Sequence, residues 1–388
     1  MNQALFHVVV LHHAADGNAP PRVEALRRAF ECVRPDLEPP PFAMQTDPWS
    51  LVSFAAYPSP EAFEQGLDAI GERALFILLL TEKMVEDPAW KDALQILAMA
   101  LPRDPTKGTR NALCFATFEG AEQSLPEGLR HRQIPESAIL GERRLRPHTL
   151  ALLALYRARR VLGANPGQNT LKLFISHAKA DGLFLARSLL GLIGDVPELE
   201  KWYDAVDIQS GDNWSEEIEA AASSSVFIAI RTEAYDLSPW CRREFETALA
   251  AGVPIVVVDA LLRPAVNPST LPYSAMPNIR IPDGNTHRVL TAAFREHLRL
   301  LLVETQVADQ MPPGSLSAAW RVWPRLPSLA VIQKRAAALT TQEFWLLPQT
   351  QHATQEFTAA RDWLTKTGSQ LRLEAVDSFL LLAGAAPI

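Results

Sequence analysis

The residues best suited to chemistry lie in the segment SPWCRREFETAL, where a tryptophan and a glutamate stand four positions apart. At that spacing Trp240 and Glu244 fall on one face of a helix, so an aromatic ring and a carboxylate can line the same cleft. A carboxylate held beside a reacting sugar stabilises oxocarbenium-like charge, as in glycoside hydrolysis. The charges of CRREFE also fit a solvated helix face, which is the ordinary structural interpretation of Glu244.

Further polar candidates follow the first two strands expected in this half of the chain. Ser176, His177 and Lys179 end or follow the apolar run LKLFISHA, and open α/β sheets bind ligands at the carboxyl ends of their strands. Asp204 and Asp207 lie in the polar segment KWYDAVDIQSGDNW. These two carboxylates fit turn formation as well as a role in shaping a pocket. A lone surface lysine is the ordinary interpretation of Lys179.

Alternating apolar and amphipathic runs position these residues and predict βα units around a mostly parallel sheet. A short strand is expected at the start of KWYDAVDIQSGDNW, and buried strands are expected at 171–178, 225–230 and 253–260. Helices are expected at 181–192, 214–222, 239–251 and 287–303. Ser238 is a suitable N-cap for the third helix, with Pro239 as its first residue and Gly252 as its stop signal.

Composition narrows the classes of function. A chain of 388 residues predicts two or three domains, and 48% hydrophobic with 21% charged residues is typical of globular proteins. The net charge of -7 argues against nucleic acid as a direct partner. Cys32, Cys114 and Cys241 are far apart, which argues against a disulfide framework or a zinc site and favours a reducing cytoplasm. The apolar runs are too short for a membrane span, so no membrane partner is expected.

Three sequence blocks resemble the Toll/interleukin-1 receptor (TIR) domain of the bacterial and plant kind. FISHAKAD lies at the first strand, WYDAVDIQSGDNW follows it, and SSVFIAIRTEAYDLSPWCRREFETAL covers the next strand and helix. The resemblance covers residues 169–305, and Ser-Pro-Trp-Cys-x-x-Glu is its most diagnostic part. It implies a flavodoxin-like α/β fold, with a parallel five-stranded sheet and helices on both faces.

The resemblance also implies a choice of activities, an NAD+-cleaving enzyme or a scaffold that assembles through TIR contacts. Catalytic members carry a glutamate four residues after the tryptophan, the place that Glu244 occupies. Nicotinamide is a cationic leaving group that needs no general acid, so one carboxylate suffices; no metal or cofactor is expected beside the NAD+ substrate. The expected catalytic residue is Glu244, and the expected substrate-binding residues are Trp240, Ser176, His177, Lys179, Asp204, Asp207 and Tyr235.

The leading hypothesis is therefore an NAD+ glycohydrolase that oligomerisation activates, acting as a cytoplasmic effector of bacterial antiphage defence through NAD+ depletion. Its expected partners are NAD+, other TIR domains, and an upstream sensor protein or nucleotide signal. Two alternatives stay open: a non-catalytic TIR adaptor, and an ADP-ribose cyclase that makes a cyclic ADP-ribose signal.

An internal repeat predicts a degenerate TIR-like domain at residues 1–163. Residues 63–88 align with 214–239 without a gap, and the shared positions include Phe76/Phe227, Thr81/Thr232 and Pro88/Pro239. Trp90 then pairs with Trp240 after one inserted residue, which places Leu94 opposite Glu244. Without the glutamate, this domain is expected to serve assembly or control.

Residues 312–388 are expected to form a small α/β accessory domain. It follows the proline-rich linker MPPGSL and has no chemical motif. Helices are expected at 328–339 and 354–365, and strands at 344–347 and 370–375.

Overall fold

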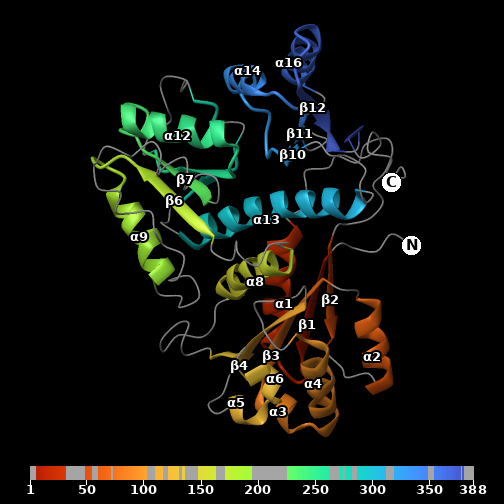
Figure 1. Cartoon of the computed structure of the whole chain (residues 1–388). Coiled ribbons are helices and arrows are strands. Elements are labelled where there is room, and N and C mark those ends of the chain that lie inside the picture. The colour runs from red at the N-terminus through yellow and green to blue at the C-terminus, as the bar shows by residue number, and fades with distance from the viewer. Residues whose placement is uncertain are drawn as a thin grey trace. The chain divides into compact units, whose positions relative to one another are not determined.

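The computed structural model describes most of the chain, and three parallel sheets organise it (Figure 1). The described residues are 6–31, 49–54, 60–70, 73–102, 110–116, 121–130, 133–135, 147–162, 171–194, 225–261, 271–273, 276–281, 286–311, 319–347, 354–376 and 378–379. The chain divides into two compact units, of which the first holds the sheet β1 to β5 and the second holds the sheets β6 to β9 and β10 to β12.

The first unit contains a five-stranded parallel sheet of order β2-β1-β3-β4-β5, which is the order of flavodoxin-like folds. Its strands are β1 (Phe6–His12), β2 (Trp49–Phe54), β3 (Ala74–Leu80), β4 (Arg110–Ala116) and β5 (Gln133–Pro135). Its helices are α1 (Ala19–Glu31), α2 (Pro60–Ala69), α3 (Glu82–Glu86), α4 (Pro88–Ala100), α5 (Ala121–Ser124), α6 (Glu127–Arg130) and α8 (Pro147–Leu162).

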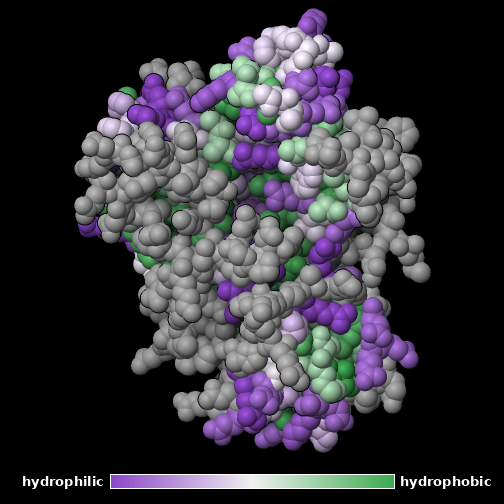
Figure 2. All heavy atoms as spheres, viewed as in Figure 1, coloured by the Kyte–Doolittle hydropathy of each residue, from purple (hydrophilic) through white to green (hydrophobic). Residues whose placement is uncertain are grey.

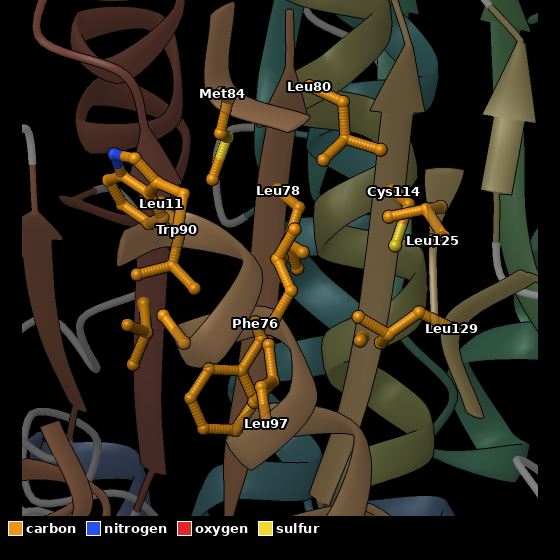
Figure 3. Close-up of a cluster of buried hydrophobic side chains, with 14 of the residues drawn as sticks. Leu11, Phe76, Leu78, Leu80, Met84, Trp90, Leu97, Cys114, Leu125 and Leu129 are labelled. Carbon is orange, nitrogen blue, oxygen red and sulfur yellow. The ribbon is translucent and has the colours of Figure 1, made fainter. Parts of the chain in front are cut away.

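Each face of this first sheet is covered by helices. Every residue of β3 is buried, as expected for an interior strand of a parallel sheet. On one face, alternate residues of β1 and β3 pack against α4 and α6 in the cluster that Figure 3 shows, where Phe76 and Leu78 lie near Trp90 and Leu97. On the other face α8 contacts β3 and β4 and pairs with α1.

The region that resembles a TIR domain contains a parallel sheet of order β6-β7-β8-β9. The strands are β6 (Lys172–His177), β7 (Ser225–Arg231), β8 (Ile255–Asp259) and β9 (Asn278–Arg280). The expectation of five strands is therefore corrected to four within the described residues. The remaining strand was expected in KWYDAV, which lies outside them, as does the helix expected at 214–222.

The strands β6, β7, β8 and β9 correspond in order to β1, β3, β4 and β5 of the first sheet. The correspondence follows because β7 pairs with β6 as β3 pairs with β1. Helix α12 (Pro239–Ala251) contacts β6 and β7, and α13 (Thr286–Gln310) contacts β7 and β8. Phe174, Phe227 and Phe245 belong to the core beneath α12. Helix α9 (Leu183–Gly194) follows β6.

A third parallel sheet, of order β10-β11-β12, occupies the C-terminal part of the chain. Its strands are β10 (Ala319–Val322), β11 (Glu343–Leu347) and β12 (Leu371–Ala375), and its helices are α14 (Leu329–Ala338) and α16 (Gln355–Lys366). The strand β10 was not expected, because proline-rich sequence surrounds it. The other four elements agree with the expected ranges to within one residue at each end.

Helix α13 is shared between the second and third sheets. Val289, Leu290 and Phe294 are buried in its N-terminal half, while Val303 and Val307 join a core with Phe344 and Leu346 of the third sheet. The helix therefore continues past residue 303, where it was expected to end, because its last turns have a second apolar surface to pack against.

The outer surface of the third sheet's helices is mixed in character. Over α14 and α16, in the upper part of Figure 2, hydrophilic and hydrophobic residues alternate. Within the described ranges, none of the helices is both long and apolar enough to cross a bilayer.

Glu304 on α13 generates a prediction about stability. Burial raises the pKa of this carboxyl to about 7, against the opposing effect of Arg321. Its folded pKa lies above 4.5, so the folded chain binds more protons between pH 4.5 and 7, and stability falls as pH rises through that window. Glu304→Gln should therefore stabilise the protein at pH 8 by up to about 3 kcal/mol.

The gain should largely disappear at pH 5, and thermal unfolding at both pH values measures it. Asp309→Asn, an exposed position later on α13, is the control. An equal effect of Glu304→Gln at pH 8 and pH 5 would contradict the raised pKa.

Candidate functional site

Helix α12 carries core residues on one face and the candidate site residues on the neighbouring face. Ser238 accepts a hydrogen bond from the amide of Cys241, Pro239 starts the helix and Gly252 ends it in the left-handed conformation, all as the sequence predicted. Cys241 and Phe245 are buried in the core. Trp240 and Glu244 each precede one of them by one position; Glu244 lies at the border between core and solvent, and Trp240 is exposed.

A chain of three hydroxyl and carboxyl groups connects the end of β6 and the loop after β7 to this helix. The Oγ of Ser176 at the end of β6 donates to Oε2 of Glu244 at 2.5 Å, and the hydroxyl of Tyr235 lies 2.9 Å from the same Oγ. Each hydroxyl has one proton, so donation by Ser176 to Glu244 requires Tyr235 to donate to Ser176. Ser176 and Tyr235 are buried, whereas Glu244 is partly exposed.

Burial sets the protonation behaviour of this chain of groups. It raises the pKa of the Glu244 carboxyl above its usual value, and the hydrogen bond from Ser176 opposes that rise because it stabilises the charged form. Burial also raises the pKa of Tyr235 well above its usual value, so the phenol keeps its proton and remains a donor. The result is a carboxylate at the edge of the core that is held in position by a fixed donor.

The loops around the site are tied together by carboxylates that the sequence analysis did not single out. Asp181 accepts from the Thr232 hydroxyl at 2.6 Å and from the Ala234 amide at 2.9 Å, which joins the loop after β6 to the loop after β7. Asp181 ends the FISHAKAD block, but only the folded chain shows its partners. Asp236 accepts from the Tyr273 hydroxyl at 2.5 Å.

Exposed apolar side chains surround the same loops. Trp240 is 62% exposed, Leu237 81% and Phe184, at the start of α9, 78%. Since Trp240 is mostly exposed, it does not serve as a core residue. Leu183 is also exposed.

Two further predicted site residues, His177 and Lys179, lie apart from the hydrogen bonds of Glu244 in the described part of the chain. Consecutive strand residues point to opposite faces, so His177 faces away from the side on which Ser176 meets α12. Burial lowers the pKa of its imidazole. Lys179 is exposed in the loop after β6. Asp204 and Asp207 lie outside the described residues.

In the first unit apolar residues stand at the places of Glu244 and Ser176. Helices α4 and α12 both begin with proline and both have 13 residues, so they align without a gap. Ala93 then stands opposite Glu244, and Trp90 opposite the buried Cys241. Trp90 is itself 2% exposed and lies in the core, so its expected match with Trp240 is replaced by this gapless one.

The strand registers identify the residue of the first unit that corresponds to Ser176. His12 pairs with Leu79 in the first unit, and His177 pairs with Ile230 in the second. Leu11 therefore stands where Ser176 stands, and it packs into the core beneath α4.

Comparison with known families identifies one domain in the second unit. Residues 173–287 match the family model described as TIR domain. The chain therefore carries a TIR domain, and this domain contains Ser176, Tyr235, Trp240 and Glu244. No curated protein matches the chain.

The chemistry of the site is that of one carboxylate beside an exposed aromatic ring. Among the residues that the structure describes, no group of three or more His, Cys, Asp or Glu side chains is arranged to bind a metal ion. The thiol of Cys241 is buried, and burial raises its pKa. The thiol therefore stays protonated and is poorly suited to act as a nucleophile. Glu244 is the group with the position and charge to stabilise a developing cation.

The link between Ser176 and Glu244 generates a prediction about titration. Ser176→Ala removes a donor to the carboxylate, so the pKa of Glu244 should move further upward. Carboxyl ¹³C NMR titration of the folded protein measures it. Ser188→Ala on α9, whose hydroxyl donates to the Phe184 carbonyl, is the control. An unchanged Glu244 titration in Ser176→Ala would show that the hydrogen bond has no energetic effect.

Proposed function

We propose that this protein is an NAD+ glycohydrolase that releases nicotinamide and becomes active on self-association through its TIR domain. The observation that carries the proposal is the partly buried Glu244 carboxylate, held by Ser176 and placed one helical turn after the exposed ring of Trp240. NAD+ enters as substrate, and the reaction needs no cofactor.

The proposed reaction breaks the bond between C1′ of the ribose and the nicotinamide nitrogen. Nicotinamide leaves with the bonding electron pair and becomes neutral, while positive charge develops on the ribose as an oxocarbenium ion. The Glu244 carboxylate stabilises this charge. Water then adds to C1′ and loses a proton, which gives ADP-ribose. Trp240 offers its exposed face to the substrate, and the ammonium of Lys179 offers a charge for the pyrophosphate.

Ser176 and Tyr235 act on the carboxylate in this proposal rather than on the substrate. Their hydrogen bonds fix the orientation of Glu244, so little reorganisation is needed as charge develops. This assigns Ser176 and Tyr235 a positioning role, in place of the substrate contact expected of them from the sequence.

Self-association is proposed from the apolar side chains beside the site. Phe184, Leu237 and Trp240 are large and mostly exposed, and clusters of such residues are typical of protein interaction sites. A second TIR domain seated there would enclose one side of the site, with the attacking water still admitted. The proposed setting is a cytoplasmic antiphage effector that stays inactive until a sensor protein or nucleotide signal drives assembly, with the first unit as a degenerate, non-catalytic TIR-like regulator.

Glu244→Gln should lower nicotinamide release by about a hundredfold or more, because the neutral amide does not stabilise the ribosyl cation. Release is measured by chromatography with the protein concentrated until light scattering shows assembly. Glu246→Gln, an exposed position on the same helix, is the matched control and should leave release unchanged. Equal release by wild type and Glu244→Gln would refute the role of Glu244.

The products separate the alternatives. Assembled wild-type protein without nicotinamide release would support the adaptor hypothesis. Nicotinamide release with a cyclic product in place of ADP-ribose would support the cyclase.

The pH dependence of release tests the charge of the carboxylate. Only ionised Glu244 stabilises a cation, and burial raises its pKa above the usual 4.5. Release should therefore increase with pH through a limb that lies above pH 4.5, and Ser176→Ala should move that limb to higher pH. A limb that stays in place in Ser176→Ala would contradict the assignment of the limb to Glu244.

A further inference from the structure

The C-terminal sheet contacts the end of helix α12 that lies farthest from Glu244. Both belong to the second compact unit. Arg321 of β10 donates a hydrogen bond to the carbonyl of Ala251, the last residue of α12. A cation at a helix C-terminus also interacts favourably with the helix dipole.

Trp323, directly after β10, packs against the residue that ends α12. Gly252 has a φ of 65°, and a Cβ atom added there would lie 2.4 Å from the Trp323 ring, so the ring requires the absence of a side chain. Trp323 is 2% exposed, and its ring centroid lies 4.4 Å from that of Trp345. The Arg321 guanidinium lies 4.6 Å from the centroid of the Trp323 ring. Arg321, Trp323, Ala251 and Gly252 together are called the α12 clamp below.

The charged surroundings hold Arg321 in place. Glu304 on α13 and Glu343 on β11 attract its guanidinium, and Arg335 on α14 repels it. Arg335 is itself paired with Glu343, and Glu343 accepts from the Trp345 indole at 2.6 Å. The clamp is therefore built on the framework of the third sheet rather than on a loose side chain.

Because α12 is a short and rigid helix, a shift of its C-terminal end also moves its N-terminal end. Glu244 and Ala251 are seven residues apart, a distance of about 10 Å along the helix axis. At its first turn α12 is held by the Ser238 cap and by Arg242, which donates to the Asp236 carbonyl at 2.8 Å. The clamp joins the opposite end of α12 to the C-terminal sheet.

We propose that the C-terminal sheet is a positioning element for the candidate site, with Arg321 and Trp323 holding the end of α12 and thereby setting where Trp240 and Glu244 lie. The effect of this clamp on NAD+ cleavage rests on the proposed function, whereas its effect on α12 does not. The accessory region thus acts on the site through the helix that carries the catalytic carboxylate.

Arg321→Met tests the clamp, because methionine keeps an unbranched stem but removes the donor and the charge. Amide hydrogen exchange of α12 should accelerate about fivefold, the effect of losing one hydrogen bond, and the ¹³C titration of Glu244 should shift. Arg321→Lys keeps a donor and a charge and should restore both in part. Arg361→Met is the control, since the Arg361 guanidinium lies over Phe357 in α16 and touches no part of α12 in the described contacts.

Gly252→Ala provides a second test from the other side of the contact, because the added Cβ displaces the Trp323 ring. It should also accelerate exchange in α12. Wild-type exchange and an unshifted Glu244 titration in Arg321→Met and in Gly252→Ala would overturn the clamp.

The enzyme assay gives a separate readout. Arg321→Met should lower kcat/KM for nicotinamide release, because Trp240 and Glu244 both shift with the helix. Faster exchange in α12 with no release by wild type would support the clamp and refute the proposed function. Nicotinamide release by wild type, with unaltered hydrogen exchange of α12 in the variants, would support the proposed function and refute the clamp.

Discussion

The arrangement of the site depends on how helix α12 packs against its sheet. Cys241 and Phe245 turn inward, and the neighbouring stripe then holds Glu244 at the border of the core, where burial raises the pKa of its carboxyl. Ser176 offsets part of that cost with a hydrogen bond to the charged form. A carboxylate in this position is open to solvent on one side and accepts a hydrogen bond from Ser176 on the other.

The two units show how few residues separate a core from a site on the same topology. Ala93 and Leu11 of the first unit occupy the places of Glu244 and Ser176, and both are buried apolar residues. At these two positions the first unit has apolar side chains, and both belong to the hydrophobic core beneath α4. A sheet of flavodoxin-like order therefore supports either a site or a core, and side-chain chemistry decides which.

Much of the fold could be predicted because local signals were strong. The strands at 172–177 and 225–231 are apolar runs between polar ends, and α12 has a serine cap, a proline at its start and a glycine at its end. The end of α13 and the strand β10 were not predictable, because both depend on the third sheet packing against that helix. The Trp90 match was wrong for a related reason, since periodicity alone does not show which tryptophan is buried.

The sequence by itself determined the TIR domain, because the spacing within its three blocks is a local property of the chain. It singled out eight candidate site residues without showing which of them meet: Ser176, His177, Lys179, Asp204, Asp207, Tyr235, Trp240 and Glu244. Only the tertiary structure decided that Ser176 hydrogen-bonds both Tyr235 and Glu244, that His177 faces away from Glu244, and that Asp181 joins two loops. Hydrogen bonds between residues 50 to 70 positions apart depend on strand register and helix rotation, and these are set by the burial of apolar side chains across the whole sheet.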